Sequence, residues 1–352
     1  MMLKEQGFMK KILLIVCVLL GSASYAQNDP VYSQRIHNPV SYNPANAGMF
    51  NGTLRGTGTF RRQWEGISNI SYQTMAVNAD FPLVHDPFGS DDFIGMGINV
   101  ESDQAGQSAF QQLNANLAFS YVRPMDQYNW ISVGFQAGYS QKSLSTAGLN
   151  WADTWTTVGF DPTIGTAEVF TNESSNYLDF GAGINFYRHS RSGAKAFAGY
   201  SMYHASEPSV NFLGTDDIIS RLHVVSGGVL IGNKKKDVYF FPNAIWQTQS
   251  SITTITYGMD LKFMLGGATT HTGYLTESSL SLGVYHRWDD ALIPTLRIQK
   301  GGFDLGVSFD VNIGDITRIN GGMGGPEFRL AYRAGYKKGS RNKGKKTFTS
   351  FM

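Results

Sequence analysis

Residues 301–312 read Gly-Gly-Phe-Asp-Leu-Gly-Val-Ser-Phe-Asp-Val-Asn, and the fold can be predicted from the pattern of this segment. From Phe303 onward, apolar residues alternate strictly with small or polar ones. The apolar set therefore lies on one face of a β-strand and the polar set on the other. Ten alternating residues are enough for a tilted strand to cross a bilayer. The stretch predicts a membrane-spanning strand with one face toward lipid.

The same alternation recurs along most of the chain and predicts about fourteen strands. Single-chain bacterial barrels have an even number of strands, and unpaired backbone groups are too costly in lipid to leave a sheet edge open. We therefore expect an all-β fold, a closed transmembrane antiparallel β-barrel. The predicted strands are residues 54–64, 72–81, 93–102, 110–122, 130–140, 177–187, 195–203, 222–231, 238–249, 255–265, 278–287, 293–299, 303–312 and 327–336.

Composition supports a barrel. Of 352 residues, only 16% are charged and 13% are aromatic, and 40 are glycine. A soluble domain usually carries about 25% charged residues, whereas a barrel with one apolar and one polar face needs fewer. The net charge of +2 argues against nucleic acid as the main partner.

The N-terminus has the features of a secretory signal. Lys10 and Lys11 precede an apolar run over 12–20, and Ser24-Tyr25-Ala26 offers a cleavage site before Gln27. We predict a signal peptide over residues 1–26. Because the only cysteine, Cys17, lies in this segment, the mature chain is expected to form no disulfide and no thiolate metal site.

Three further regions follow the signal. Residues 27–52 are rich in Pro and Asn, which favour turns. We expect them to form a plug-like segment in or beneath the barrel on the periplasmic side, because Tyr32, Ile36, Val40, Tyr42 and Met49 would otherwise be exposed. The barrel is assigned to 53–336 and a basic periplasmic tail to 337–352. With both termini in the periplasm, the longest connection faces outside, as is usual for outer-membrane barrels.

The lumen is predicted to be polar and of mixed charge. Such a lining can conduct water and solutes, or it can bond to a plug. Arginine on the lipid face would cost about 2–4 kcal/mol near the midplane, which also places Arg329 and Arg333 inside. The other residues that face inward by parity are Arg55, Arg61, Gln63, Asp260, Lys262, Asp304 and Asp310.

Signatures of catalysis are weak. His223, His286, Asp289 and Asp290 are the residue types of a hydrolase, but their spacing matches no nucleophile–base arrangement. Paired acids at Asp91-Asp92, Asp216-Asp217 and Asp289-Asp290 are expected to be solvated rims rather than metal ligands. We predict no catalytic, cofactor or metal site.

The long external connection is a candidate contact surface. Trp151 and Trp155 lie in it among Thr, Asp and Gly, and exposed aromatic residues often anchor protein interfaces. The same residues would also suit packing within the loop or the membrane belt.

Several motifs together resemble the PorP/SprF family, outer-membrane proteins of the type IX secretion and gliding machinery of Bacteroidetes. The chain opens with QNDPVYSQ at 27–34 and NPANAG at 43–48, similar to the family's QDPxYSQ and NPAxAG. RRQWEG at 61–66 resembles R-N-Q-W-x-G, with Arg62 where the family often has Asn. Further similar segments are EPSVNF at 207–212, YHRWDDALIP at 285–294, residues 301–315 and residues 324–332.

The resemblance implies a non-enzymatic membrane component that binds either the periplasmic ring of the machinery or a large secreted adhesin through its C-terminal domain. It leaves open whether the barrel serves export, retention or display. A general diffusion porin is the alternative, and an outer-membrane hydrolase is a third hypothesis. The partner-binding candidates are Asn43, Pro44, Arg62, Gln63, Trp64, Trp151, Trp155, Phe212 and Trp288.

Overall fold

The computed structural model describes most of the chain after the predicted signal segment. The described residues are 29–64, 72–106, 110–145, 154–157, 159–161, 164, 173–191, 193–212, 217–233, 237–266 and 278–335. Residues 1–26 and the basic tail 337–352 lie outside them, so the signal and the tail stay predictions. Among the described residues, no helix is both long and apolar enough to cross a membrane.

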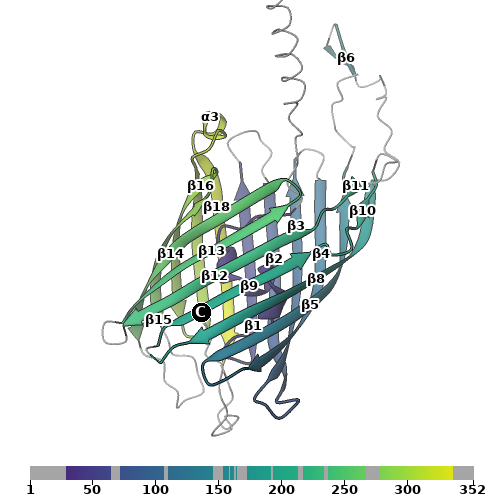
Figure 1. Ribbon diagram of the computed structural model, residues 1–352. Helices are drawn as coiled ribbons and strands as arrows, with labels where there is room; N and C mark the ends of the chain where they lie inside the picture. The colour runs from purple at the N-terminus through teal and green to yellow at the C-terminus, as the bar shows by residue number, and fades with distance from the viewer. Residues whose placement is uncertain are drawn as a thin grey trace, which may run out of the picture.

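The predicted barrel is confirmed: fourteen antiparallel strands form one closed sheet (Figure 1). The first and last strands close it, with Leu54 opposite Ala334 and Arg61 opposite Glu327. The strands are β1 (Leu54–Gln63), β2 (Tyr72–His85), β3 (Phe93–Ala105), β4 (Phe110–Pro124), β5 (Asn129–Ser143), β8 (Ser174–His189), β9 (Lys195–Tyr203), β12 (Leu222–Asn233), β13 (Val238–Gln249), β14 (Ile252–Gly266), β15 (Ser278–Arg287), β16 (Ala291–Lys300), β17 (Phe303–Asn312) and β18 (Met323–Ala334).

The alternation in β17 has the predicted effect. Phe303 and Leu305 are 56% and 45% exposed on the outer face, whereas Asp304 and Asp310 are only 8% and 1% exposed inside the barrel. Exposed large apolar side chains recur on the outer face of the other strands. A soluble protein would have to cover such a band, and hydrocarbon accommodates it without cost.

The strands are strongly tilted. Following cross-strand partners from Ser175 of β8 around the barrel leads through Arg61 to His189, fourteen residues further along the same strand. This displacement is the shear of the barrel, and a shear equal to the number of strands gives the large tilt that membrane barrels have.

Most predicted strands differ from the structure by a few residues at one end or both, and two of these differences have a clear local cause. β1 stops at Gln63, because Trp64 has a left-handed backbone with φ 58°, a conformation that cannot continue a strand. β18 begins at Met323 rather than at 327, and its register shifts opposite Asp310 and Val311. Gly325, with φ 151°, permits this irregular start.

We call the two openings of the barrel the upper and lower mouths, as drawn in Figure 1. The upper mouth carries the β5–β8 connection with β6 (Trp155–Thr156) and β7 (Gly159–Phe160), and the β9–β12 connection with β10 (Ser209–Val210) and β11 (Asp217–Ile218). It also carries α3 (Thr317–Asn320), between β17 and β18. The lower mouth carries the connections that follow β2, β4, β8, β12, β14 and β16.

Residues 29–50 form what we call the inner segment, which lies within the barrel (Figure 1). It contains three short helical turns, η1 (Arg35–His37), α2 (Pro39–Tyr42) and η2 (Pro44–Asn46). The five apolar residues that the sequence predicts to be covered, Tyr32, Ile36, Val40, Tyr42 and Met49, are 6%, 4%, 4%, 1% and 5% exposed.

The inner segment runs lengthwise through the lumen. It begins at the upper mouth, where Asp29 bonds to His204 beyond the end of β9. It ends at the lower mouth, where the Arg55 guanidinium lies over the Phe50 ring at 4.8 Å. Thr53 then bonds to Ala334, at the lower end of β18. The two ends of the described part of the chain, Asp29 and Gly335, therefore lie at opposite mouths. The termini themselves lie outside the described residues, so their periplasmic location stays a prediction.

Candidate functional site

The lumen is the candidate site, because charged side chains converge there on the inner segment. Near the upper mouth, Arg61 is only 2% exposed and donates to Asp310 at 2.6 Å. Arg287 donates to the same carboxylate at 2.5 Å. Ser33 donates its hydroxyl to the other oxygen of Asp310. One wall carboxylate thus joins three partners, which compensates for its removal from water.

A second polar centre surrounds His37 at the middle of the lumen. Arg297 donates to Nδ1 of His37 at 2.8 Å. Because arginine can only donate, Nδ1 is an acceptor and the ring proton is on Nε2, which lies 3.1 Å from Asp260. Arg297 also donates to Asp304 at 2.6 Å. His37 is therefore held as a neutral imidazole between a cation and an anion.

The lower part of the inner segment lies directly on the wall. Asn43 donates to the carbonyls of Ile184 and Tyr200, on neighbouring strands. A Cβ added at Gly134 would lie 2.3 Å from the Ala45 nitrogen. One added at Gly95 would lie 2.0 Å from the Ala47 oxygen. Only glycine permits this close approach of two backbones.

A hydrogen-bonded cluster holds the start of the inner segment at the upper mouth. His204 lies 2.8 Å from Asp29 through Nε2 and 3.0 Å from Asp179 through Nδ1. Burial disfavours the charged ring, but the two carboxylates outweigh burial and raise the pKa of His204 to about 10. His204 is therefore an imidazolium at neutral pH. We call these three residues the latch.

The latch should weaken at alkaline pH. The stability contributed by a raised pKa is complete below the ordinary value of 6.5 and is lost as the pH rises through about 10. A fluorophore attached at Pro30→Cys should therefore lose anisotropy between pH 7 and pH 11. In His204→Gln, which does not titrate there, the anisotropy should be low and independent of pH. A pH-independent, high anisotropy in both proteins would contradict the latch.

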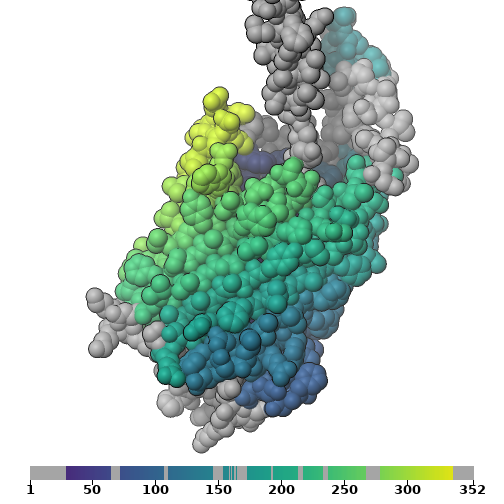
Figure 2. Space-filling view, viewed as in Figure 1, coloured from purple at the N-terminus to yellow at the C-terminus, as the bar shows by residue number. Residues whose placement is uncertain are grey.

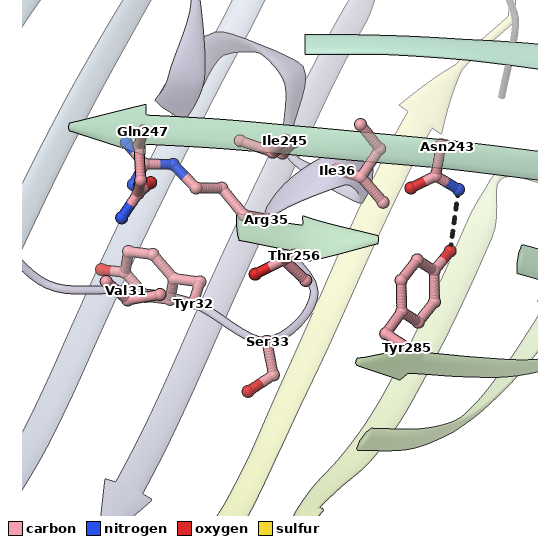
Figure 3. A pocket seen from close by; sticks show the side chains of 10 residues that line it. All are labelled: Val31, Tyr32, Ser33, Arg35, Ile36, Asn243, Ile245, Gln247, Thr256 and Tyr285. Atoms are coloured by element: carbon pink, nitrogen blue, oxygen red, sulfur yellow. Dashed lines mark hydrogen bonds between the residues drawn. The ribbon is translucent and has the colours of Figure 1, made fainter. Parts of the chain in front are cut away.

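A small hollow lies beside the upper part of the inner segment, with space for about one water molecule (Figure 3). Its lining comes from residues 31–33, 35 and 36 and from β13, β14 and β15. Asn243 donates to the Tyr285 hydroxyl at 3.1 Å on one side, and Ile36 and Ile245 are apolar. The hollow is a packing gap between the segment and the wall rather than a ligand cavity.

The predicted partner-binding residues that the structure describes lie in separate environments. Asn43 and Pro44 are buried in the lumen and contact the wall. Trp155 and Trp288 are 60% and 61% exposed at the upper mouth. Phe212 packs on Phe110 with the ring centroids 6.2 Å apart. Trp151 lies outside the described residues. The candidates therefore do not form one surface.

Residues 62–64 of the RRQW motif lie where β1 meets β18 at the upper mouth. Arg62 and Gln63 are the last residues of β1. The Trp64 amide donates to Gly324 at 2.9 Å. The Trp64 ring packs edge-on against Tyr72 at 4.7 Å. The half-buried residues 62–64 therefore help to hold the closing seam of the barrel together.

The residues considered for hydrolysis are not assembled. His286 lies on the outer face against the Tyr257 hydroxyl at 2.8 Å, and His223 lies likewise against Tyr200 at 2.8 Å. Asp290 pairs with Arg287. In the parts of the chain that the structure describes, no three His, Cys, Asp or Glu residues are grouped as a metal site.

Sequence reasoning missed the residues that hold the inner segment. The sequence pattern assigns Glu327 to a strand and gives it no partner, yet it is 1% exposed and accepts hydrogen bonds from Ser33 and Gln34. The pattern likewise gives His37 no partner. A usable signal was present, since an acid at an inward position of a membrane strand requires a partner inside. The sequence does not say which segment supplies it.

Comparisons with known proteins agree with this architecture. The family model described as "Type IX secretion system membrane protein PorP/SprF" matches residues 24–323. No curated protein sequence matches the chain significantly.

Solved structures of outer-membrane barrels are similar in fold. A TodX deltaS2S3 mutant monoaromatic hydrocarbon channel has a TM-score of 0.51 and 7% identity over 84% of this chain and 94% of its own. CdiB from Acinetobacter baumannii has a TM-score of 0.41 and 9% identity over 80% of this chain, which spans 60% of CdiB. BamA from Haemophilus ducreyi lacking POTRA domains 1-3 has a TM-score of 0.40 and 10% identity, over 80% and 70% of the two chains.

At such identities, likeness to a solved structure shows the fold alone. The family model is more informative, because it covers most of the barrel together with the inner segment. The chain belongs to the PorP/SprF family of type IX secretion system membrane proteins.

Proposed function

We propose that this barrel is a non-enzymatic outer-membrane component of the type IX secretion and gliding machinery. It acts by binding protein, either periplasmic ring components or the C-terminal domain of a secreted adhesin. Family membership supports this role. A second observation supports the role independently of the family: the inner segment occupies the lumen. A porin for the diffusion of solutes needs an open lumen.

We propose further that the inner segment is a plug. Its side chains from Tyr32 to Phe50 are almost all buried, and atoms of the purple N-terminal residues are seen in the upper mouth in Figure 2. Buried hydrogen bonds from Ser33 and Gln34 to the wall carboxylates Glu327 and Asp310 are costly to break once formed. A plug of this kind favours a protein-binding role over that of a porin.

The orientation of the barrel follows the usual rule for outer-membrane proteins. The upper mouth, with its long connections and exposed Trp155 and Trp288, is assigned to the cell exterior. The lower mouth, with short turns, is assigned to the periplasm. In this orientation the start of the inner segment faces outside, where an exported adhesin would be retained.

Two experiments test this function. Affinity capture of the tagged barrel after gentle extraction should recover ring components or an adhesin, and a Trp288→Ala variant should recover less of a partner that docks at the upper mouth. Capture of neither class under these conditions would contradict the proposal.

The porin alternative is tested by conductance. In planar bilayers the intact barrel should show little or no steady conductance, because the inner segment occupies the lumen. A barrel in which part of the segment has been displaced should conduct more. Large, constant ohmic channels in the intact protein would instead favour diffusion.

A further inference from the structure

The lumen wall bonds to the main chain of the inner segment, and wall serines provide one half of this contact. Ser120 donates its hydroxyl to the Ala47 carbonyl at 2.6 Å. Ser132 donates to the Ala45 carbonyl at 2.5 Å. On a third strand, Ser201 donates to the carbonyl of Tyr42 at 2.5 Å. All three serines are at most 2% exposed. Three strands thus present buried donors to three carbonyls of the inner segment, those of Tyr42, Ala45 and Ala47.

Wall carboxylates provide the complementary half. Glu327 accepts the amide protons of Ser33 and Gln34, at 2.6 and 2.8 Å. Asp80 accepts the amide proton of Gly48 at 2.8 Å. Hydrogen bonds to an ionised acceptor are stronger than neutral ones. The wall therefore recognises amide protons at both ends of the segment and carbonyls between them.

Wall glycines allow the inner segment to approach the strands closely. Gly95 and Gly134 allow the backbone at Ala47 and Ala45 to touch the strands. A larger side chain on the wall would hold the backbone beyond hydrogen-bond distance from the serines. The wall can therefore bind any chain that has small residues where the inner segment has Ala45 and Ala47.

From these contacts we propose that the lumen wall is a peptide-binding groove, that its ligand is the main chain of a polypeptide segment, and that the inner segment is its exchangeable resident. The proposal deepens the protein-binding function proposed above and rests on it. An equivalent segment of a protein partner would use the same serines and carboxylates after the resident has left.

Peptide exchange in the purified barrel tests the proposal. A protease site inserted after Asn51 allows the inner segment to be cut from β1 while it remains bound. After a mild urea step, a labelled peptide of residues 29–50 should re-enter the barrel and saturate it at one peptide per barrel. A scrambled peptide should bind far more weakly, because it places large residues against Gly95 and Gly134.

Backbone-modified peptides identify the contact. Methylation of the Gln34 or Gly48 nitrogen removes an amide proton that the wall accepts, so each should weaken binding about tenfold. Methylation of the Val31 nitrogen, which makes no bond to the described wall, is the matched control. Equal binding of all these peptides, or of the scrambled one, would overturn the proposal.

A measurement on the intact chain guards against a barrel that fails to refold. Trypsin can cut after Arg35 only when the segment leaves the wall. Replacing Ser120, Ser132 and Ser201 together by alanine should speed this cleavage at least tenfold, whereas Ser250→Ala, on an exposed turn, should not. An unchanged cleavage rate in the triple variant would overturn the proposal. Partner capture does not depend on this exchange, so the two proposals can fail separately.

Discussion

Replacing Gly134 by valine should displace the lower part of the inner segment from the lumen. The new Cβ would lie 2.3 Å from the Ala45 nitrogen and 2.4 Å from the Pro44 carbonyl carbon. Both atoms belong to a backbone, so no side-chain rotation relieves the overlap. Overpacking of this kind costs about 1–3 kcal/mol, and moving the segment also breaks the bond from Ser132 to Ala45. The barrel should conduct in planar bilayers and be cut by trypsin after Arg35.

The matched control for this variant is Gly58→Val. A Cβ at Gly58, on β1, meets no heavy atom within 4 Å, and valine favours strands. Its conductance and its trypsin resistance should equal those of the unmodified protein. If Gly134→Val kept both properties as well, the close approach of the segment to β5 would be wrong.

Replacing Arg61 by methionine should destabilise the barrel by about 3–5 kcal/mol, the usual cost of removing one partner of a buried ion pair. Arg61 and Asp310 have side chains only 2% exposed. Without the guanidinium, Asp310 retains Arg287, whereas Glu327, 3.8 Å from Arg61, loses its nearest cation. Urea unfolding in lipid vesicles measures the change, together with the loss of heat resistance on semi-native gels.

Arg318→Met is the matched control for Arg61→Met, because it makes the same substitution in an ion pair at the surface. Arg318 pairs with Asp315 at 3.6 Å, but both side chains are at least 86% exposed. Exposed pairs of this kind contribute about 0–1 kcal/mol. Equal effects of the two substitutions would mean that the lumen is as well hydrated as the surface.

The barrel could be predicted from the sequence because its cause is local. In β17 the alternation from Phe303 to Asn312 specifies both faces of the strand, and hydrocarbon then requires closure. The end of β1 cannot be predicted in this way, because tryptophan does not by itself favour the left-handed conformation that Trp64 adopts beside its bond to Gly324.

The path of the inner segment could not be predicted, because its causes are distant in sequence. Pattern indicated that Ile36 and Tyr42 are covered. Which wall covers them depends on contacts such as Ser33 to Glu327, 294 residues apart. The direction of travel depends on Asp29 meeting His204, which periodicity does not encode. Long-range polar contacts of this kind leave no local pattern in the sequence.

The inner segment descends through the barrel from the upper mouth to the lower one. Single cysteines in a Cys17→Ser background test it, labelled in intact cells with a maleimide that does not cross the outer membrane. Pro30→Cys should react together with Ser250→Cys, at the upper mouth, while Asp126→Cys, at the lower mouth, reacts only after lysis. If Pro30→Cys were labelled only after lysis, as is expected for Asp126→Cys, this path would be contradicted.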